Sequence, residues 1–133
     1  MADMEKQEAS FQDRASGWAM ECFGPAGAVV LHERVHRFLE EGLELAQSLG
    51  CMKEDAHTLV DYVFGRPVGE PPQEAGGTMV GLAILCNVAS IDLDAAAETE
   101  LARCWKNTDR IRAKWQGKPK LGPLPGPSVP VVE

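Results

Sequence analysis

Glycine and proline divide this 133-residue chain into segments with helical rather than extended character. The breaks fall at residues 24–25, at 50, across 65–72 and from 117 onward. No alternation of apolar and polar residues is long enough for a convincing strand. The pattern predicts an all-α fold, a four- to five-helix bundle. The expected helices cover residues 9–22, 28–49, 53–64, 72–89 and 92–115.

The length suits one small domain with a single core, which we place over residues 1–116. Residues 117–133 hold five of the nine prolines and are expected to form an extended tail. The formal net charge of −7 argues against a nucleic-acid polymer as partner, because phosphate backbones attract a lysine and arginine excess. A polar metabolite or a protein is a better match for the partner.

No apolar run in the chain is long enough to cross a membrane, and the first ten residues are polar rather than a secretory leader. The four cysteines are scattered, without a C-x-x-C pair. We therefore expect a cytoplasmic protein with reduced thiols and no membrane partner.

The stretch HERVHRFLEEGLELAQ, residues 32–47, contains two metal-site motifs. Its first half reads H-E-x-x-H, with His32 and His36 one helical turn apart, which is typical of zinc proteases. Its second half reads E-E-x-x-E, with Glu40, Glu41 and Glu44 as the acids. The two halves predict different chemistry.

Helical periodicity separates this segment into two faces. Glu40, Glu41 and Glu44 lie opposite the apolar arc, close enough to converge on one point. Carboxylate-only ligation favours Mg²⁺, with Mn²⁺ also suitable. The apolar arc is the expected core face and consists of Leu31, Val35, Phe38, Leu39, Leu43, Leu45, Ala46 and Leu49.

Two other interpretations of the same residues remain. An ordinary surface helix also carries charges, and Glu33, Arg37 and Glu41 form an i, i+4 ladder. A zinc protease needs a third ligand and an edge strand for its substrate, and the sequence offers no such strand. His32 is then interpreted as a packed histidine that lies toward the apolar arc.

A second acid opens the apolar segment PPQEAGGTMVGLAILCNVA, where Glu74 lies in the expected first turn. The glycines of this segment, Gly76, Gly77 and Gly81, predict close approach of another backbone or a ligand. EEGLE followed by EAGG resembles the MazG-like all-α nucleoside triphosphate pyrophosphohydrolases, whose motif is E-E-x-x-E, a spacer, and E-x-x-D. The likeness covers roughly residues 31–115.

The resemblance implies a Mg²⁺ site made of Glu41 and Glu44 with Glu40 adjacent, and Glu74 as the first acid of the second motif. It also implies a homodimer or homotetramer. The chain departs from the motif at Gly77, which stands where the family has Asp. Acids that could substitute for it are Asp61, Glu98 and Glu100.

Hydrolysis of a nucleoside triphosphate to monophosphate and pyrophosphate needs a general base and cations around the phosphates. We expect the catalytic carboxylates to be Glu40 and Glu41, with Glu40 acting as the general base. Arg103, Lys106 and Arg110 share one face of the expected last helix and are candidates for phosphate binding. Candidates for base contact are Trp18, Asn107, Phe11 and Trp105.

Overall fold

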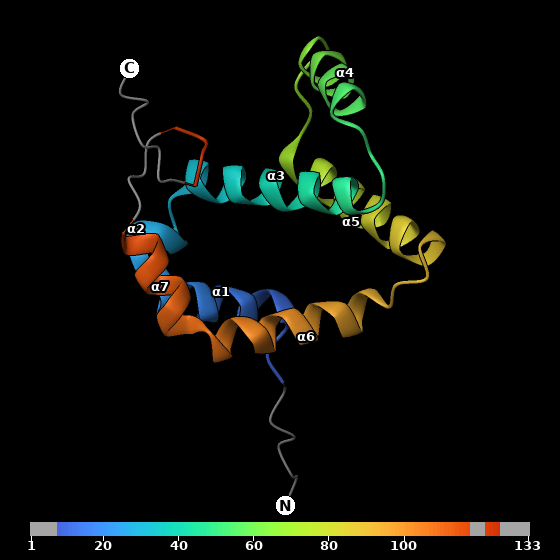
Figure 1. Ribbon diagram of the computed structural model, residues 1–133. Coiled ribbons are helices and arrows are strands. Elements are labelled where there is room, and N and C mark those ends of the chain that lie inside the picture. Colours follow the sequence, from blue (N-terminus) through green and yellow to red (C-terminus); the bar gives the residue numbers. More distant parts are fainter. Residues whose placement is uncertain (1–7, 118–121, 126–133) are drawn as a thin grey trace, which may run out of the picture. The chain divides into compact units, whose positions relative to one another are not determined.

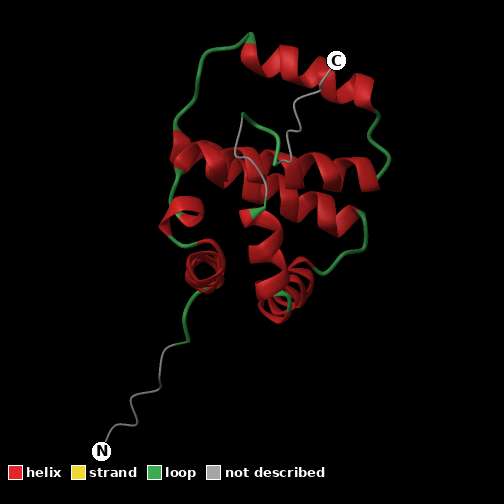
Figure 2. Ribbon diagram, turned by 60° about the vertical axis from the view of Figure 1, so that its left-hand side comes forward, coloured by secondary structure: helices red, strands yellow, loops and turns green. Residues whose placement is uncertain are grey.

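The computed structural model describes residues 8–117 and 122–125, and every regular element within them is a helix (Figures 1 and 2). This confirms the all-α prediction. In these residues seven helices follow one another: α1 (Phe11–Phe23), α2 (Pro25–Ala28), α3 (Leu31–Ser48), α4 (Lys53–Phe64), α5 (Pro71–Val88), α6 (Leu93–Lys106) and α7 (Thr108–Gln116). Most of the predicted tail, residues 117–133, lies outside the described residues.

The turn between α1 and α2 adds a short helix that the sequence pattern did not predict. Gly24 has φ +64°, in the left-handed region that favours glycine, and its N–H donates to the Met20 carbonyl at 2.9 Å. Pro25 then occupies the first turn of α2, where a missing N–H costs nothing. The strong break at residues 24–25 therefore ends one helix and begins another within two residues.

The last expected helix is also divided, so the prediction of one helix over residues 92–115 is wrong. Asn107 has φ −108° and ψ 16° and separates α6 from α7. Its Nδ2 donates to the Arg103 carbonyl at 2.8 Å, and the Thr108 hydroxyl donates to the Cys104 carbonyl at 3.0 Å. Polar side chains that bond to nearby backbone in this way compete with the regular helical pattern.

Contacts divide the chain into two units. The terminal unit contains residues 1–38 and 100–133, and the central unit contains residues 39–99, so the division falls within α3 and within α6. The assignment of residues 1–116 to one domain stays a prediction.

Within the terminal unit, α1 packs against α2 and α7 around Phe23. The Phe23 ring lies 5.5 Å from the Trp18 ring in a T-shaped arrangement and 5.3 Å from the Trp115 ring. The Arg34 guanidinium lies over the same ring, 5.1 Å from its centroid. These aromatic and cation–π contacts join α1, α3 and α7, three elements that are distant in sequence.

Arg112 of α7 secures the end of α1. Its Nε donates to the Cys22 carbonyl at 3.0 Å and its terminal nitrogen to the Glu21 carbonyl at 2.7 Å. These carbonyls belong to the last turn of α1, where no further helical N–H follows to satisfy them. The planar guanidinium thus serves as a cap from another helix.

Replacing Arg112 with lysine is expected to destabilise the fold by about 1–2 kcal/mol, because a single ammonium cannot reproduce two hydrogen bonds in a fixed fork. Urea denaturation followed by far-ultraviolet circular dichroism measures the change. The matched control is Arg110→Lys, an exposed position on the same helix. Equal midpoints for the two variants would contradict the capping role.

The four cysteines form no disulfide in the described part of the chain. Cys22 and Cys86 are buried, while Cys51 and Cys104 are half-buried. Burial raises the pKa of the Cys22 thiol, and burial together with the nearby Glu100 carboxylate raises the pKa of the Cys104 thiol. Both side chains are therefore neutral thiols at physiological pH.

The predicted core face of α3 is largely uncovered in the single chain, which corrects the expectation of a packed core there. No residue of α3 is buried, and Phe38, Leu39 and Leu43 have exposed fractions of 59%, 52% and 46%. The helix has the amphipathic pattern that burial requires. The described residues of one chain do not supply the surface that would cover it.

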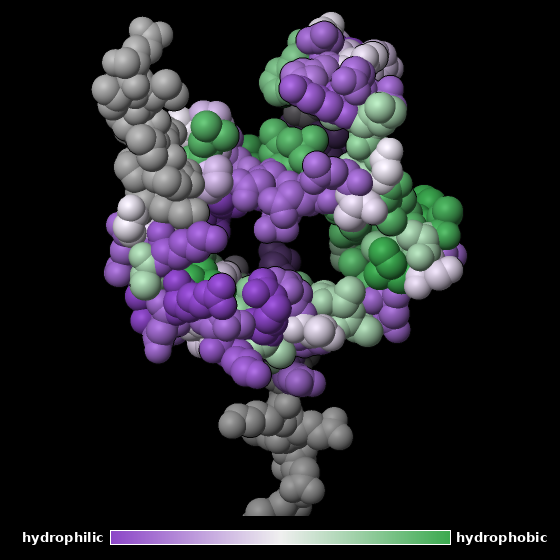
Figure 3. Space-filling view, in the orientation of Figure 1, coloured by the Kyte–Doolittle hydropathy of each residue, from purple (hydrophilic) through white to green (hydrophobic). Residues whose placement is uncertain are grey.

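The helix α5 is apolar on nearly all sides, and it too was expected in the interior. Only Cys86 of α5 is buried, whereas Met79, Val80 and Ile84 are each 60% exposed. Apolar side chains gather over this helix in the space-filling view (Figure 3). No single described helix is long and apolar enough to cross a membrane; α5 and α6 together, bent by 103°, pass that test by length and composition only.

Candidate metal and nucleotide site

The acids of the E-E-x-x-E motif lie on the part of α3 that belongs to the central unit. Glu40 is half-buried, and Glu41 and Glu44 are exposed. A continuous helix through all three places Glu40 and Glu44 on successive turns, with Glu41 beside them. The helical spacing on which the metal prediction depends is therefore present.

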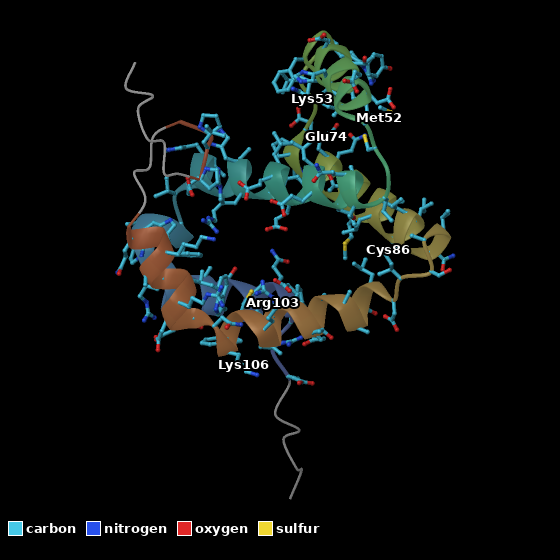
Figure 4. All side chains as sticks on the ribbon, in the orientation of Figure 1. Met52, Lys53, Glu74, Cys86, Arg103 and Lys106 are labelled. Atoms are coloured by element: carbon cyan, nitrogen blue, oxygen red, sulfur yellow. The ribbon has the colours of Figure 1, made fainter. Side chains whose placement is uncertain are left out.

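Glu74 lies in the first turn of α5, also within the central unit (Figure 4). Its side chain folds back toward the preceding loop, so that a Cβ added at Gly69 would lie 3.0 Å from the Glu74 Cδ. The absence of a side chain at Gly69 provides the space for this carboxylate. The acid is held at the opening of the helix, where the positive end of the dipole favours it.

The described residues of one chain do not assemble these acids into a complete site. Among them, no group of three or more histidine, cysteine, aspartate or glutamate side chains lies close enough together to hold a metal ion. The roles of Glu40, Glu41, Glu44 and Glu74 as ligands, and of Glu40 and Glu41 in catalysis, stay predictions.

The glycines of α5 face open space. A Cβ added at Gly76, Gly77 or Gly81 meets no atom within 4 Å. Among the described residues, therefore, no backbone from another element makes the close approach that these glycines predicted. The same observation shows that a Cβ at Gly77 meets no obstruction among the described residues.

The proposed substitutes for the missing aspartate have different environments. Asp61 is exposed on α4 and Glu98 is exposed on α6. Glu100 accepts two hydrogen bonds from Arg103, at 2.8 and 2.5 Å, and these bonds lower the pKa of its carboxyl. Glu100 is thus an ion-paired acid of the terminal unit.

The break at Asn107 changes the setting of the basic residues. Arg103 and Lys106 project from α6 (Figure 4), whereas Arg110 belongs to α7. They do not share one face of a single helix as predicted, and Arg103 binds Glu100. Their contact with phosphate stays a prediction without that geometric support.

The residues proposed for base contact have roles in the fold. Trp18 Nε1 donates to the Thr108 hydroxyl at 3.1 Å, and the Asn107 amide is used at the break between α6 and α7. Phe11 and Trp105 are 40% and 47% exposed. The structure therefore explains Trp18 and Asn107 by packing between α1, α6 and α7, and their contact with a nucleotide base stays a prediction.

The terminal unit contains a pocket that the sequence did not predict. Its volume is about 260 Å³. The lining residues are Ala26, Val30, His32, Glu33, His36, Trp115 and Gly122. The H-E-x-x-H motif was the sequence feature that could have indicated this pocket. Nothing in the local pattern indicated that Trp115 and Gly122 would line it as well.

Comparison with protein-family models, with curated proteins and with solved structures found no match to this chain.

Proposed function

We propose that this protein hydrolyses a nucleoside or deoxynucleoside triphosphate to the monophosphate and pyrophosphate, with Mg²⁺ as cofactor, in editing of a nucleotide pool. The observation that carries the proposal is E-E-x-x-E on α3 together with Glu74 opening α5, in an all-α chain. The proposed architecture is the helical bundle of the all-α nucleoside triphosphate pyrophosphohydrolases.

The chemistry of the donors fits a hard cation. Glu41, Glu44, Glu74 and Glu40 offer only carboxylate oxygens, which suit Mg²⁺ or Mn²⁺. When bound, the ion offsets charge on the phosphate oxygens. Glu40, the half-buried acid, removes a proton from a water molecule while the oxygen of that water forms a bond to the α-phosphorus. The bond from that phosphorus to the bridging oxygen breaks, and pyrophosphate leaves with the electron pair.

A homodimer or homotetramer is part of the proposal. The central unit exposes Leu59 at 57%, Phe64 at 83% and Ile84 at 60%, in addition to the apolar face of α3. Large exposed apolar surfaces are rare on soluble monomers and commonly mark an interface, so these exposed side chains support a second copy as the partner. Covering it with a second copy would also bring further acids and cations near α3 and α5.

Light scattering of the full chain is expected to give at least twice the 14.4 kDa of one chain. Ile84→Glu should shift the particle toward the monomer, because a charge within an apolar interface loses its hydration without a partner. Gln73→Glu adds the same charge at a polar position of α5 and serves as the control. A monomeric wild-type protein would rule out this part of the proposal.

The direct test is release of pyrophosphate from a panel of nucleoside and deoxynucleoside triphosphates, with Mg²⁺ or Mn²⁺. The expected result is metal-dependent release from at least one nucleotide, with the monophosphate as the second product. No release from any nucleotide, together with no Mg²⁺ binding by calorimetry, would refute the enzyme.

The alternative is a MazG-like module that has lost catalysis and binds a nucleotide or a protein partner. Gly77 favours it, because this position provides no carboxylate where the related motif has Asp. Nucleotide binding without pyrophosphate release would support this alternative.

Replacing Gly77 with aspartate is expected to raise the apparent Mg²⁺ affinity by about 10-fold, and pyrophosphate release with it, since each added carboxylate increases the charge that attracts the ion. The side chain has room, because a Cβ at this position meets nothing within 4 Å. Gly76→Asp is the matched control, with equal space but a direction about 100° around the helix. An equal gain in both variants would indicate general electrostatics rather than ligation.

A further inference from the structure

The pocket of the terminal unit presents the two histidines of H-E-x-x-H on one side of α3. The ring centroids of His32 and His36 are 6.3 Å apart, with the rings edge to face. A metal ion bound to an imidazole nitrogen at about 2.0–2.1 Å lies roughly 3 Å from the ring centroid, so two rings that share an ion have centroids roughly 5–6 Å apart. A small rotation of the exposed His32 side chain brings the pair within that range.

His36 lacks the contacts of a structural histidine. Its Nδ1 is buried and has no hydrogen-bond partner among the described residues. Buried polar side chains that serve only packing are normally hydrogen-bonded, so this nitrogen calls for an explanation. Because no described residue bonds to Nδ1, this nitrogen is able to present a lone pair to a ligand.

Glu33, the acid of the motif, is paired with two arginines. Its carboxylate lies 3.6 Å from the Arg37 guanidinium and 3.8 Å from that of Arg34. Among the described residues, no group of three histidine, cysteine, aspartate or glutamate side chains that could hold a metal ion includes the pair. A zinc protease requires a third ligand and a general base, so the geometry argues against peptidase chemistry at this motif.

We propose that His32 and His36 chelate one divalent transition-metal ion, with Zn²⁺ as the preferred ion, in this pocket. Imidazole nitrogen suits Zn²⁺ rather than Mg²⁺, so the site is distinct in chemistry from the carboxylates of α3. The pocket of about 260 Å³ has room for several water molecules to complete the coordination. The proposal is independent of nucleotide hydrolysis.

The chain provides its own control, because His57 on α4 is the only other histidine. Calorimetric titration of the full-length protein with Zn²⁺, in saturating Mg²⁺, should show one ion per chain. Loss of an outer-shell partner alone weakens metal sites about 10–100-fold, so His32→Ala and His36→Ala should each weaken binding at least about 10-fold. His57→Ala should leave it unchanged.

Cys51 and Cys104 carry the less buried of the four thiols, which are also soft donors, so Cys51→Ser and Cys104→Ser complete the set. Circular dichroism checks that each variant keeps its helices, and His36→Gln provides a second substitution at the half-buried position. No stoichiometric Zn²⁺ in the wild type, or binding lost in a cysteine variant and retained in both histidine variants, would overturn the proposal.

Discussion

Replacing Glu41 with glutamine is expected to lower metal-dependent pyrophosphate release by at least about 100-fold. Glutamine keeps the size and helix preference of the side chain but removes its charge, and a bound metal contributes several kcal/mol to phosphoryl chemistry. Because the Glu41 side chain is exposed, the substitution should leave the apolar packing of α3 unchanged. The loss should therefore appear in kcat or in metal affinity and not in the unfolding midpoint.

Glu54→Gln is the matched control for this experiment, since Glu54 is also an exposed helical acid but opens α4 outside either motif. Glu44→Gln should behave like Glu41→Gln. If all three variants retain wild-type release, the acids of α3 do not hold the metal. A reduction shared equally by the control would point to the net charge of the protein instead.

Replacing Gly27 with alanine is expected to destabilise the protein by about 1–3 kcal/mol, the usual cost of adding a methyl group to a filled site. Gly27 is buried in α2, and a Cβ there would lie 2.6 Å from the Phe23 Cβ and 2.8 Å from the Trp115 Cζ2. The Phe23 Cβ is fixed to the backbone of α1 and cannot move alone. The methyl group must therefore displace α2 or the Trp115 ring.

Gly17→Ala is the control and should change stability in the opposite direction. Gly17 lies inside α1, and a Cβ at this position meets nothing within 4 Å. Alanine is favoured over glycine in a helix interior by about 0.5–1 kcal/mol. Urea denaturation with tryptophan fluorescence measures both variants. Stabilisation of both would show that α2 does not pack against Phe23 and Trp115.

Local sequence was sufficient to place most helices. The predicted helix over residues 53–64 has the same bounds as α4, because an acidic first turn and Gly65 mark its two ends. The break at Asn107 was missed because no glycine or proline marks it, although Asn107, Thr108 and Asp109 are weak helix formers. Only the hydrogen bonds of the Asn107 and Thr108 side chains to the preceding turn reveal the interruption.

The candidate site was predictable to the level of spacing and no further. The positions of Glu40, Glu41 and Glu44 on α3 follow from helical geometry, which the sequence contains. How near Glu74 comes to these acids depends on how the helices pack against one another. Helical periodicity shows which face of a helix is apolar but not which element covers that face. The exposed faces of α3 and α5 are examples of this limit, because their apolar patterns predict burial but do not indicate which surface covers them.

By itself, the sequence determined the helical class, most helix bounds and the motifs on α3 and α5, because these depend on residues within a few turns of one another. Tertiary structure alone decided the close packing around Gly27, the hydrogen bond of Trp18 and the lining of the pocket beside His32 and His36. Each of these depends on α7 or on residues 122–125, which lie far along the chain. Contacts between such distant residues arise from packing and leave no local signal in the sequence.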